Sequence, residues 1–268
     1  MTAVTGRGGL RAALVSGTLL VAAAGTVQAQ TVGATVSIFA VRGTYATETT
    51  DGLYLFTGVD AAGGPVRLAV SFPLMRVESN PLAPLPDGIL LYPYSSTGVG
   101  DPLLRGDLRL VNDTQRGLQV SVAGAMKFGL VDATTGRGTG EHDVGAGGSA
   151  FAFRGRTSLM ADVMFWHYGD PDGVDYEDGL SYSVGAGRLI GTGRWSVLGS
   201  VAGFSTGIAG APPPVSVGVS LLGAFINGQS VAVSASVGLN ESASDFSVGV
   251  SWRIAQRVRS RSARSGNP

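Results

Sequence analysis

Few residues of this chain could carry covalent or metal chemistry. It has two histidines, His142 and His167, and no cysteine, so it can form neither a disulfide nor a thiolate metal site. A lipid-cleaving serine hydrolase would need a histidine beside a nucleophilic serine, and Ser149 and Ser158 are the nearest serines in sequence. Because nothing in the spacing brings these groups together, we interpret both histidines as residues near strand ends and expect no enzyme activity.

The densest acidic stretch runs from Gly169 to Asp178. Clustered carboxylates could hold Ca²⁺, but their spacing and the closing glutamate differ from those of an EF-hand loop. We therefore favour a solvated outer loop that divalent ions bridge to lipopolysaccharide. The glycine-rich stretch 136–148 lacks the Gly-Lys-Ser/Thr of a phosphate loop. The sequence predicts no cofactor and no metal site.

Composition narrows the class of protein. Nineteen basic and nineteen acidic residues give a net charge of zero, so no basic surface for nucleic acid is expected. Charged residues make up 14% of the chain, whereas soluble domains have about 25%. With 44% hydrophobic residues the chain is too apolar to be a disordered polar segment. After the N-terminus no run of 18 apolar residues occurs, so any membrane insertion must use strands.

The elements that must position the polar residues are strands, because apolar and polar residues alternate repeatedly after residue 30. In the clearest segment, 118–128, Val120, Val122 and Met126 alternate with Ser121, Ala123 and Lys127. The pattern predicts about twelve strands, at residues 34–45, 52–60, 65–77, 102–111, 118–129, 143–153, 157–168, 179–189, 194–205, 215–225, 229–239 and 245–254.

Short and long connections alternate between these strands, with a hairpin signal at Asn227-Gly228. This layout is typical of an outer-membrane barrel with its long loops outside the cell. The alternative is a soluble sandwich, but the polar face is mostly Ser, Gly and Ala rather than charged. Aromatic residues near strand ends would form the interfacial girdles: Tyr45, Phe128, Phe153, Trp195 and Trp252. The predicted fold class is all-β, an antiparallel transmembrane β-barrel of about twelve strands.

The chain divides into three parts. Residues 1–29 have the cationic start, apolar centre and small-residue cleavage site of a signal peptide, which places the mature N-terminus at Gln30. The barrel occupies residues 30–254. Residues 255–268 form a basic C-terminal tail, which we expect to be a disordered periplasmic extension. This organisation predicts the outer membrane as the location.

The only functional set that the strand pattern defines is a group of polar residues on the inward face. The candidate lumen-lining residues are Arg67, Arg105, Asp107, Arg109, Gln119, Lys127 and Asp162. Charges that line a pore select among solutes. The alternative, which strand number leaves open, is a barrel whose Arg–Asp networks close the lumen.

Three segments resemble a known family. They are Pro65–Leu74, then Gly98-Val99-Gly100-Asp101 followed by Leu108-Arg109-Leu110, and then Gly136–Asp143. In this order and spacing they resemble the outer-membrane barrels of the MetA-pathway phenol-degradation family, over residues 31–254. The resemblance implies an outer-membrane pore or transporter for small solutes, aromatic compounds among them. Two features depart from the family: the usual Leu-Pro-Thr-Gly reads Leu130 to Gly136 with an insertion, and no aromatic residue ends the chain.

The leading hypothesis is a passive pore for small, aromatic or hydrophobic solutes. The first alternative is a structural or surface-interaction barrel with a closed lumen, and the second is a lipid-modifying enzyme. The partners expected for a barrel of this kind are outer-membrane lipids and lipopolysaccharide, a small-molecule solute and the barrel assembly machinery.

Overall fold

The structure is a computed structural model that describes residues 31–45, 48–81, 94–170, 177–205 and 212–258. Almost all of the regular structure is strand, apart from two 3₁₀ turns, η1 (Ala133–Thr135) and η2 (Ile226–Gly228). No helix among the described residues is long and apolar enough to cross a membrane. The strands are β1 (Thr31–Tyr45), β2 (Glu48–Gly63), β3 (Val66–Pro81), β4 (Tyr94–Val99), β5 (Leu103–Asp113), β6 (Leu118–Lys127), β7 (Asp143–Arg154), β8 (Thr157–His167), β9 (Gly179–Ile190), β10 (Trp195–Phe204), β11 (Val215–Ala224), β12 (Gln229–Gly238) and β13 (Phe246–Arg257).

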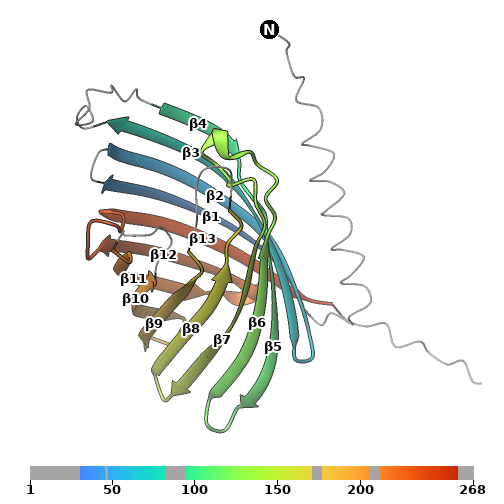
Figure 1. The fold of residues 1–268 in the computed structure, drawn as a ribbon. Helices are drawn as coiled ribbons and strands as arrows, with labels where there is room; N and C mark the ends of the chain where they lie inside the picture. The colour runs from blue at the N-terminus through green and yellow to red at the C-terminus, as the bar shows by residue number, and fades with distance from the viewer. Residues whose placement is uncertain (1–30, 46–47, 82–93, 171–176, 206–211, 259–268) are drawn as a thin grey trace, which may run out of the picture.

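These strands form one closed antiparallel sheet (Figure 1). Except for β4 and β5, which both pair with β3 and not with each other, each strand pairs with its neighbours in sequence; β13 pairs with β1, and the β2–β3 pairing completes the circle. β4 and β5 share one edge of β3: β5 pairs with Val66–Ser71 and β4 with Leu74–Ser79. Thus β4 and β5 together occupy a single position in the wall, and the barrel has twelve strand positions. Closure gives every long strand a partner on both sides, and among the described strands only the short strand β4 has an edge without a strand partner.

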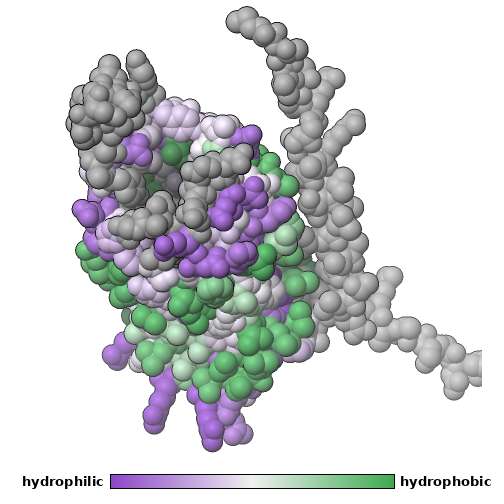
Figure 2. All heavy atoms as spheres, in the orientation of Figure 1, coloured by the Kyte–Doolittle hydropathy of each residue, from purple (hydrophilic) through white to green (hydrophobic). Residues whose placement is uncertain are grey.

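Alternation gives the barrel an apolar outside and a polar inside. Val and Leu side chains of the outward face remain exposed, as Ile38, Val219 and Val250 illustrate. Figure 2 shows an apolar band on the visible face, with hydrophilic residues beyond it at both ends. A one-residue slip in register would turn the inward charges toward lipid, where an Arg or Lys at the midplane costs about 2–4 kcal/mol.

The two ends of the barrel differ in their connections. Tight turns join β2 to β3, β5 to β6, β7 to β8, β9 to β10 and β11 to β12 at one end, which we call the turn rim (Figure 1). The longer connections lie at the other end, the loop rim, where β1 and β2 are the exception to the expected alternation because only two residues separate Tyr45 from Glu48. At the β11–β12 turn Asn227 adopts a left-handed conformation (φ 77°), as the Asn-Gly signal predicts.

The twelve predicted strands are confirmed, with ends that differ by a few residues. The largest differences are the added strand β4 inside a segment expected to be a loop, and the longer β2 and β3. β13 continues to Arg257, three residues beyond its predicted end. Phe153 shares the face of Ser158, which lies inside, so it is not part of an outer girdle, whereas Trp195 and Trp252 are exposed on the outside. The predicted signal peptide and residues 259–268 of the tail lie outside the described residues.

Candidate functional site

The inner wall of the barrel has two unlike halves. Along β9–β13 the inward residues are mostly small, because the inward face is rich in Ser, Gly and Ala. Cross-strand partners such as Ser220 and Ser234 face the lumen side by side. This half contributes little side-chain volume to the interior. Its small inward residues include Ser181, Ser183, Gly185, Gly187, Ser200, Ala202, Ser216, Gly218, Ser220, Ala232, Ser234, Ser236, Ser247, Gly249 and Ser251, and its larger inward residues are Leu189, Leu198, Phe204, Leu222 and Arg253.

The small-residue half contains a hollow near the loop rim. Its volume is about 280 Å³, and its lining includes Ala202, Phe204, Ser216, Ser236 and Ser247. A hydroxyl pair, Ser236 with Ser247 at 2.7 Å, forms part of the surface. A hollow of this size could hold a small solute.

The other half of the wall carries bulky and charged side chains. On β1 and β2 three inward aromatic rings are in contact: the centroids of Phe39 and Phe56 are 6.0 Å apart, edge to face. Tyr54 stacks on Phe56 with a centroid distance of 6.2 Å. On β8 the inward side chains include Met164 and Trp166, and the Trp166 indole donates to Ser181 Oγ at 3.0 Å. The interior therefore presents apolar rings on one wall and hydroxyl groups on the other.

The inward charges form three groups, each with a cation beside carboxylates. In the first, near the turn rim, Asp60 of β2 accepts from Arg253 of β13, with Nη2 to Oδ2 at 2.9 Å. Arg67 of β3 lies 3.6 Å from the same carboxylate. The Asp60 side chain is only 5% exposed, so the two arginines, rather than water, stabilise its carboxylate.

In the second group Arg105 reaches across the wall. Its Nε donates to Asp107 of the same strand at 3.0 Å, and its Nη2 donates to Asp162 of β8 at 2.9 Å. Strands β6 and β7 lie between β5 and β8, and their inward residues here, Ala123 and Gly147 among them, are small enough for the guanidinium to pass. A long arginine over small neighbours therefore joins two separated strands.

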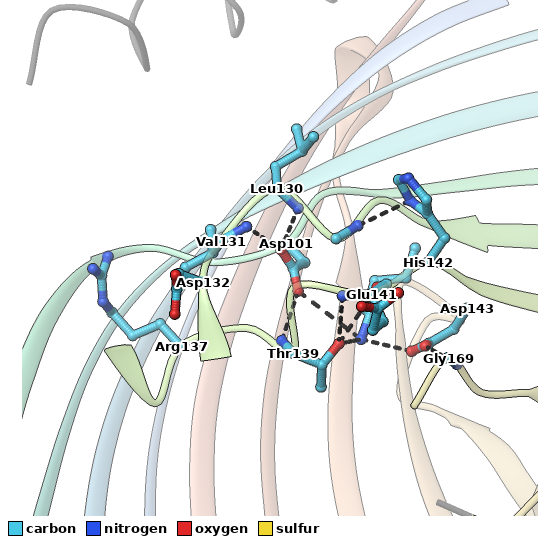
Figure 3. Close-up of polar contacts among 12 residues, drawn as sticks. Asp101, Leu130, Val131, Asp132, Arg137, Thr139, Glu141, His142, Asp143 and Gly169 are labelled. Atoms are coloured by element: carbon cyan, nitrogen blue, oxygen red, sulfur yellow. Dashed lines mark hydrogen bonds and ion pairs between the residues drawn. The ribbon is translucent and has the colours of Figure 1, made fainter. Parts of the chain in front are cut away.

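The third group lies at the loop rim, and Figure 3 shows its residues Asp101, Thr139 and Asp143. The Lys127 ammonium lies 2.6 Å from Asp143, 3.9 Å from Asp101 and 2.7 Å from Thr139 Oγ1. Asp101 is buried, and its two oxygens accept the backbone N–H groups of Leu130, Val131 and Thr139 at 2.9, 2.9 and 3.2 Å. One carboxylate thus fixes both ends of the loop 128–142.

The same loop covers the free edge of β4. Arg137 donates to the Val99 carbonyl at 3.0 Å and to Ser96 Oγ at 2.9 Å, and Tyr94 donates to the Thr135 carbonyl. Gly98 has φ 155°, and a Cβ there would collide with the Arg137 guanidinium. The two glycine-rich motifs, 98–101 and 136–143, are therefore neighbours in space, and their spacing has a structural cause. In this part of the wall, side-chain hydrogen bonds replace the strand ladder.

All seven predicted lumen residues lie on the inward face. Arg67, Arg105, Asp107, Lys127 and Asp162 belong to the three groups, whereas Arg109 and Gln119 lie nearer the turn rim with no ion pair among the described residues. Whether these residues select solutes stays a prediction. The sequence analysis missed Asp60, Asp101, Asp143 and Arg253; alternation places Arg253 inside, but only three-dimensional closure reveals its partner.

The two histidines lie at the loop rim, His142 just before β7 and His167 at the end of β8. His167 Nδ1 lies 2.9 Å from the Asp178 carboxylate on the exposed loop rim. His142 Nδ1 accepts the Gly129 N–H at 3.1 Å, and its ring packs edge to face against Phe128. Neither ring contacts a serine in the part of the chain described. The same residues contain no cluster of three potential metal ligands.

Solved structures share this architecture. The COG4313 outer membrane channel from Pseudomonas putida F1 matches with a TM-score of 0.69 and 12% identity, over 85% of this chain and 96% of that chain. The transport unit of the autotransporter AIDA-I from Escherichia coli matches with a TM-score of 0.51 and 10% identity, over 86% of this chain and 91% of that chain. No family model and no curated protein matches. The chain thus has the predicted fold of an outer membrane β-barrel, whereas the resemblance of its three segments to a family stays a prediction.

Proposed function

We propose that this protein is an outer membrane channel through which small solutes pass by diffusion. The observation that carries the proposal is the small-residue half of the inner wall. A barrel of about eight strands is just filled by its own side chains, whereas one of sixteen or more leaves a channel. With twelve positions the outcome depends on side-chain size, and the many Ser, Gly and Ala residues along β9–β13 favour an open interior, although Leu198, Phe204 and Leu222 also face inward.

The inward charges favour passage of neutral solutes. Each inward carboxylate of the three groups has a cationic partner, so the wall offers no unbalanced ring of one sign. The aromatic contact of Phe39, Tyr54 and Phe56 adds an apolar face on which a planar solute can stack. Small apolar or aromatic solutes are therefore the proposed class. No step of this proposal requires catalysis.

The outer membrane is the proposed location, with lipids and lipopolysaccharide around the barrel. The apolar outward face would be in contact with hydrocarbon, and exposed Trp195 and Trp252 lie near the strand ends at the turn rim. The barrel assembly machinery would insert the chain. Fractionation of envelopes tests the location: recovery as a water-soluble protein would contradict it.

Flux measurements test the channel. Purified protein in liposomes should permit swelling in small sugars, and Ser220→Phe with Ser234→Phe should slow swelling because both side chains enter the lumen. The matched control is Val219→Phe with Val233→Phe, which places the same rings on the lipid side of the same strands. Absence of flux in the unmodified protein, or equal flux in both double variants, would overturn the proposal.

The solute class has a separate test. Uptake of phenylalanine and leucine into the same liposomes compares an aromatic with an aliphatic zwitterion. We expect the unmodified protein to favour phenylalanine, and Phe39→Leu with Phe56→Leu to remove the preference because the inner rings are lost. An unchanged ratio would leave a channel without the proposed aromatic preference.

A further inference from the structure

Four arginines gather at two neighbouring tight turns of the turn rim. Arg154 ends β7, Arg156 lies in the β7–β8 turn, Arg188 lies near the end of β9, and Arg194 lies in the β9–β10 turn. All four are exposed. Within the described part of the chain none of the four arginines forms an ion pair, so their guanidinium groups are available to bind an anion from outside the barrel.

The strand register places two of these arginines in one row on the outside. Thr157 of β8 pairs with Arg154 on one side and with Arg188 on the other. The two arginines therefore flank the threonine hydroxyl with their Cα atoms about 10 Å apart, two strand spacings. Arg156 donates to the Gly191 carbonyl and so holds the two turns together. The four arginines and Thr157 therefore form one cluster of neighbouring residues, which we call the basic cradle.

The basic cradle lies directly beyond the apolar outer face. Leu159, two residues from Thr157 along β8, is 55% exposed on that face. Ile190 and Trp195 are also exposed beside the β9–β10 turn, and Trp195 packs edge to face on Phe225 at 5.9 Å. Aromatic rings of this kind mark the level of the lipid headgroups. Cationic groups just beyond that level are at the height of lipid phosphates.

The loop rim provides the contrast. Its outward arginines Arg42 and Arg76 each have a carboxylate partner, Asp51 and Glu78 respectively. The outward arginines Arg42 and Arg76 of the loop rim are therefore paired with carboxylates, whereas among the described residues the four arginines at the two tight turns of the turn rim are not.

We propose that Arg154, Arg156, Arg188 and Arg194, with the Thr157 hydroxyl, form a binding site for the phosphate of an anionic phospholipid headgroup. Arginine binds phosphate through charge-assisted, paired hydrogen bonds. The site fixes the depth and rotation of the barrel in the leaflet at the turn rim. It rests on the proposed membrane location but not on channel activity.

Lipid retention tests the site. The full-length protein is folded into nanodiscs of phosphatidylcholine with a small fraction of phosphatidylglycerol, and bound lipid is counted by native mass spectrometry. We expect retained phosphatidylglycerol to exceed its bulk fraction, and Arg156→Gln with Arg188→Gln to weaken binding about fivefold per arginine. The excess should also fall with added salt. The control, Arg42→Gln with Arg76→Gln, should retain the lipid.

The outcomes separate the two proposals. Failure of the folded protein to enter nanodiscs would overturn the membrane location. Insertion without an excess of phosphatidylglycerol, or an equal excess in the site and control variants, would overturn this inference alone. Displacement of the lipid by inorganic phosphate at the same concentration would also overturn it, because the site would then recognise the free ion equally well.

Discussion

Arg253 of β13 and Asp60 of β2 form an ion pair that passes over Gly33 of β1. The guanidinium Nη2 lies 2.9 Å from Oδ2 and 3.1 Å from Oδ1 of the carboxylate. A Cβ at position 33 would be 2.6 Å from Arg253 Nη2 and 2.7 Å from Asp60 Oδ1. A side chain at position 33 would therefore displace this contact, which links the last strand to the second across the first.

Asp60→Ala should destabilise the closed barrel, because it leaves Arg253 beside Arg67 without a carboxylate. Because the Asp60 side chain is buried whereas Arg253 is about one third exposed, the expected loss in unfolding free energy is about 1.5–3 kcal/mol, the range for hydrogen bonds to charged groups. Urea unfolding in lipid vesicles, followed by tryptophan fluorescence, measures it. The control is Asp51→Ala: Asp51 and Arg42 are 3.8 Å apart and about half exposed, so the loss should stay below about 1 kcal/mol. Equal losses would contradict a structural role for the closing pair.

Arg105→Gln should make the channel prefer cations. Without the guanidinium, Asp107 and Asp162 keep their negative charges in the lumen. A unit charge about 5–10 Å from a permeating ion in water is worth roughly 0.4–0.8 kcal/mol, and its loss acts with opposite sign on cation and anion, so the cation-to-anion permeability ratio should rise about fourfold to fifteenfold. Reversal potentials in a KCl gradient measure the ratio. Asp162→Asn should shift it in the opposite direction, and shifts of the same sign in both variants would refute this account.

The strand pattern was predictable because one physical requirement acts at every position. A strand between lipid and lumen must place apolar and polar residues on opposite faces, so alternation in segments such as 118–127 and 246–254 reveals strand and facing together. The aromatic residues at the membrane interface were harder to predict. Phe153 lies near a strand end, but it pairs with the inward-facing Ser158 and therefore faces the lumen.

β4 and the ion-pair partners could not be predicted in this way. The segment Tyr94–Val99 has no apolar alternation, and it is a strand only because the long β3 offers its edge while Arg137 covers the other side. Likewise Arg105 and Asp162 are 57 residues apart, and they meet because two strands of small inward residues separate them. Such contacts depend on the stagger and curvature of the closed sheet, which alternation does not encode.

Asp101→Ala should loosen the loop 128–142 while the barrel remains folded. The substitution removes the acceptor for three backbone N–H groups, and each buried donor left unpaired costs about 1–3 kcal/mol. Hydrogen exchange should accelerate at Leu130, Val131 and Thr139. The control, Asp132→Ala, removes only the local bonds to Thr134 at η1. Exchange that is unchanged at Val131 would show that the carboxylate does not hold the loop.

The contact between His167 and Asp178 should make one loop-rim junction sensitive to acid. The hydrogen bond from His167 holds the pKa of the Asp178 carboxyl below its usual value of 3.8, and the Tyr168 backbone N–H lowers it further. A lowered carboxyl pKa adds stability only above the unfolded-state pKa, and this stability is lost as the pH falls through the folded-state pKa. The junction should therefore persist at neutral pH and weaken only below about pH 4.

Carboxyl NMR titration of the His167→Phe variant tests this assignment, because removal of the imidazole should raise the Asp178 midpoint toward 3.8. Asp132 provides an internal control. Its pKa is also lowered, but by the hydroxyl and backbone N–H of Thr134, so its midpoint should be the same in both proteins. An Asp178 midpoint that does not move would mean that His167 contributes nothing to the charge of this carboxylate, and the backbone bond from Tyr168 would then be the dominant contact.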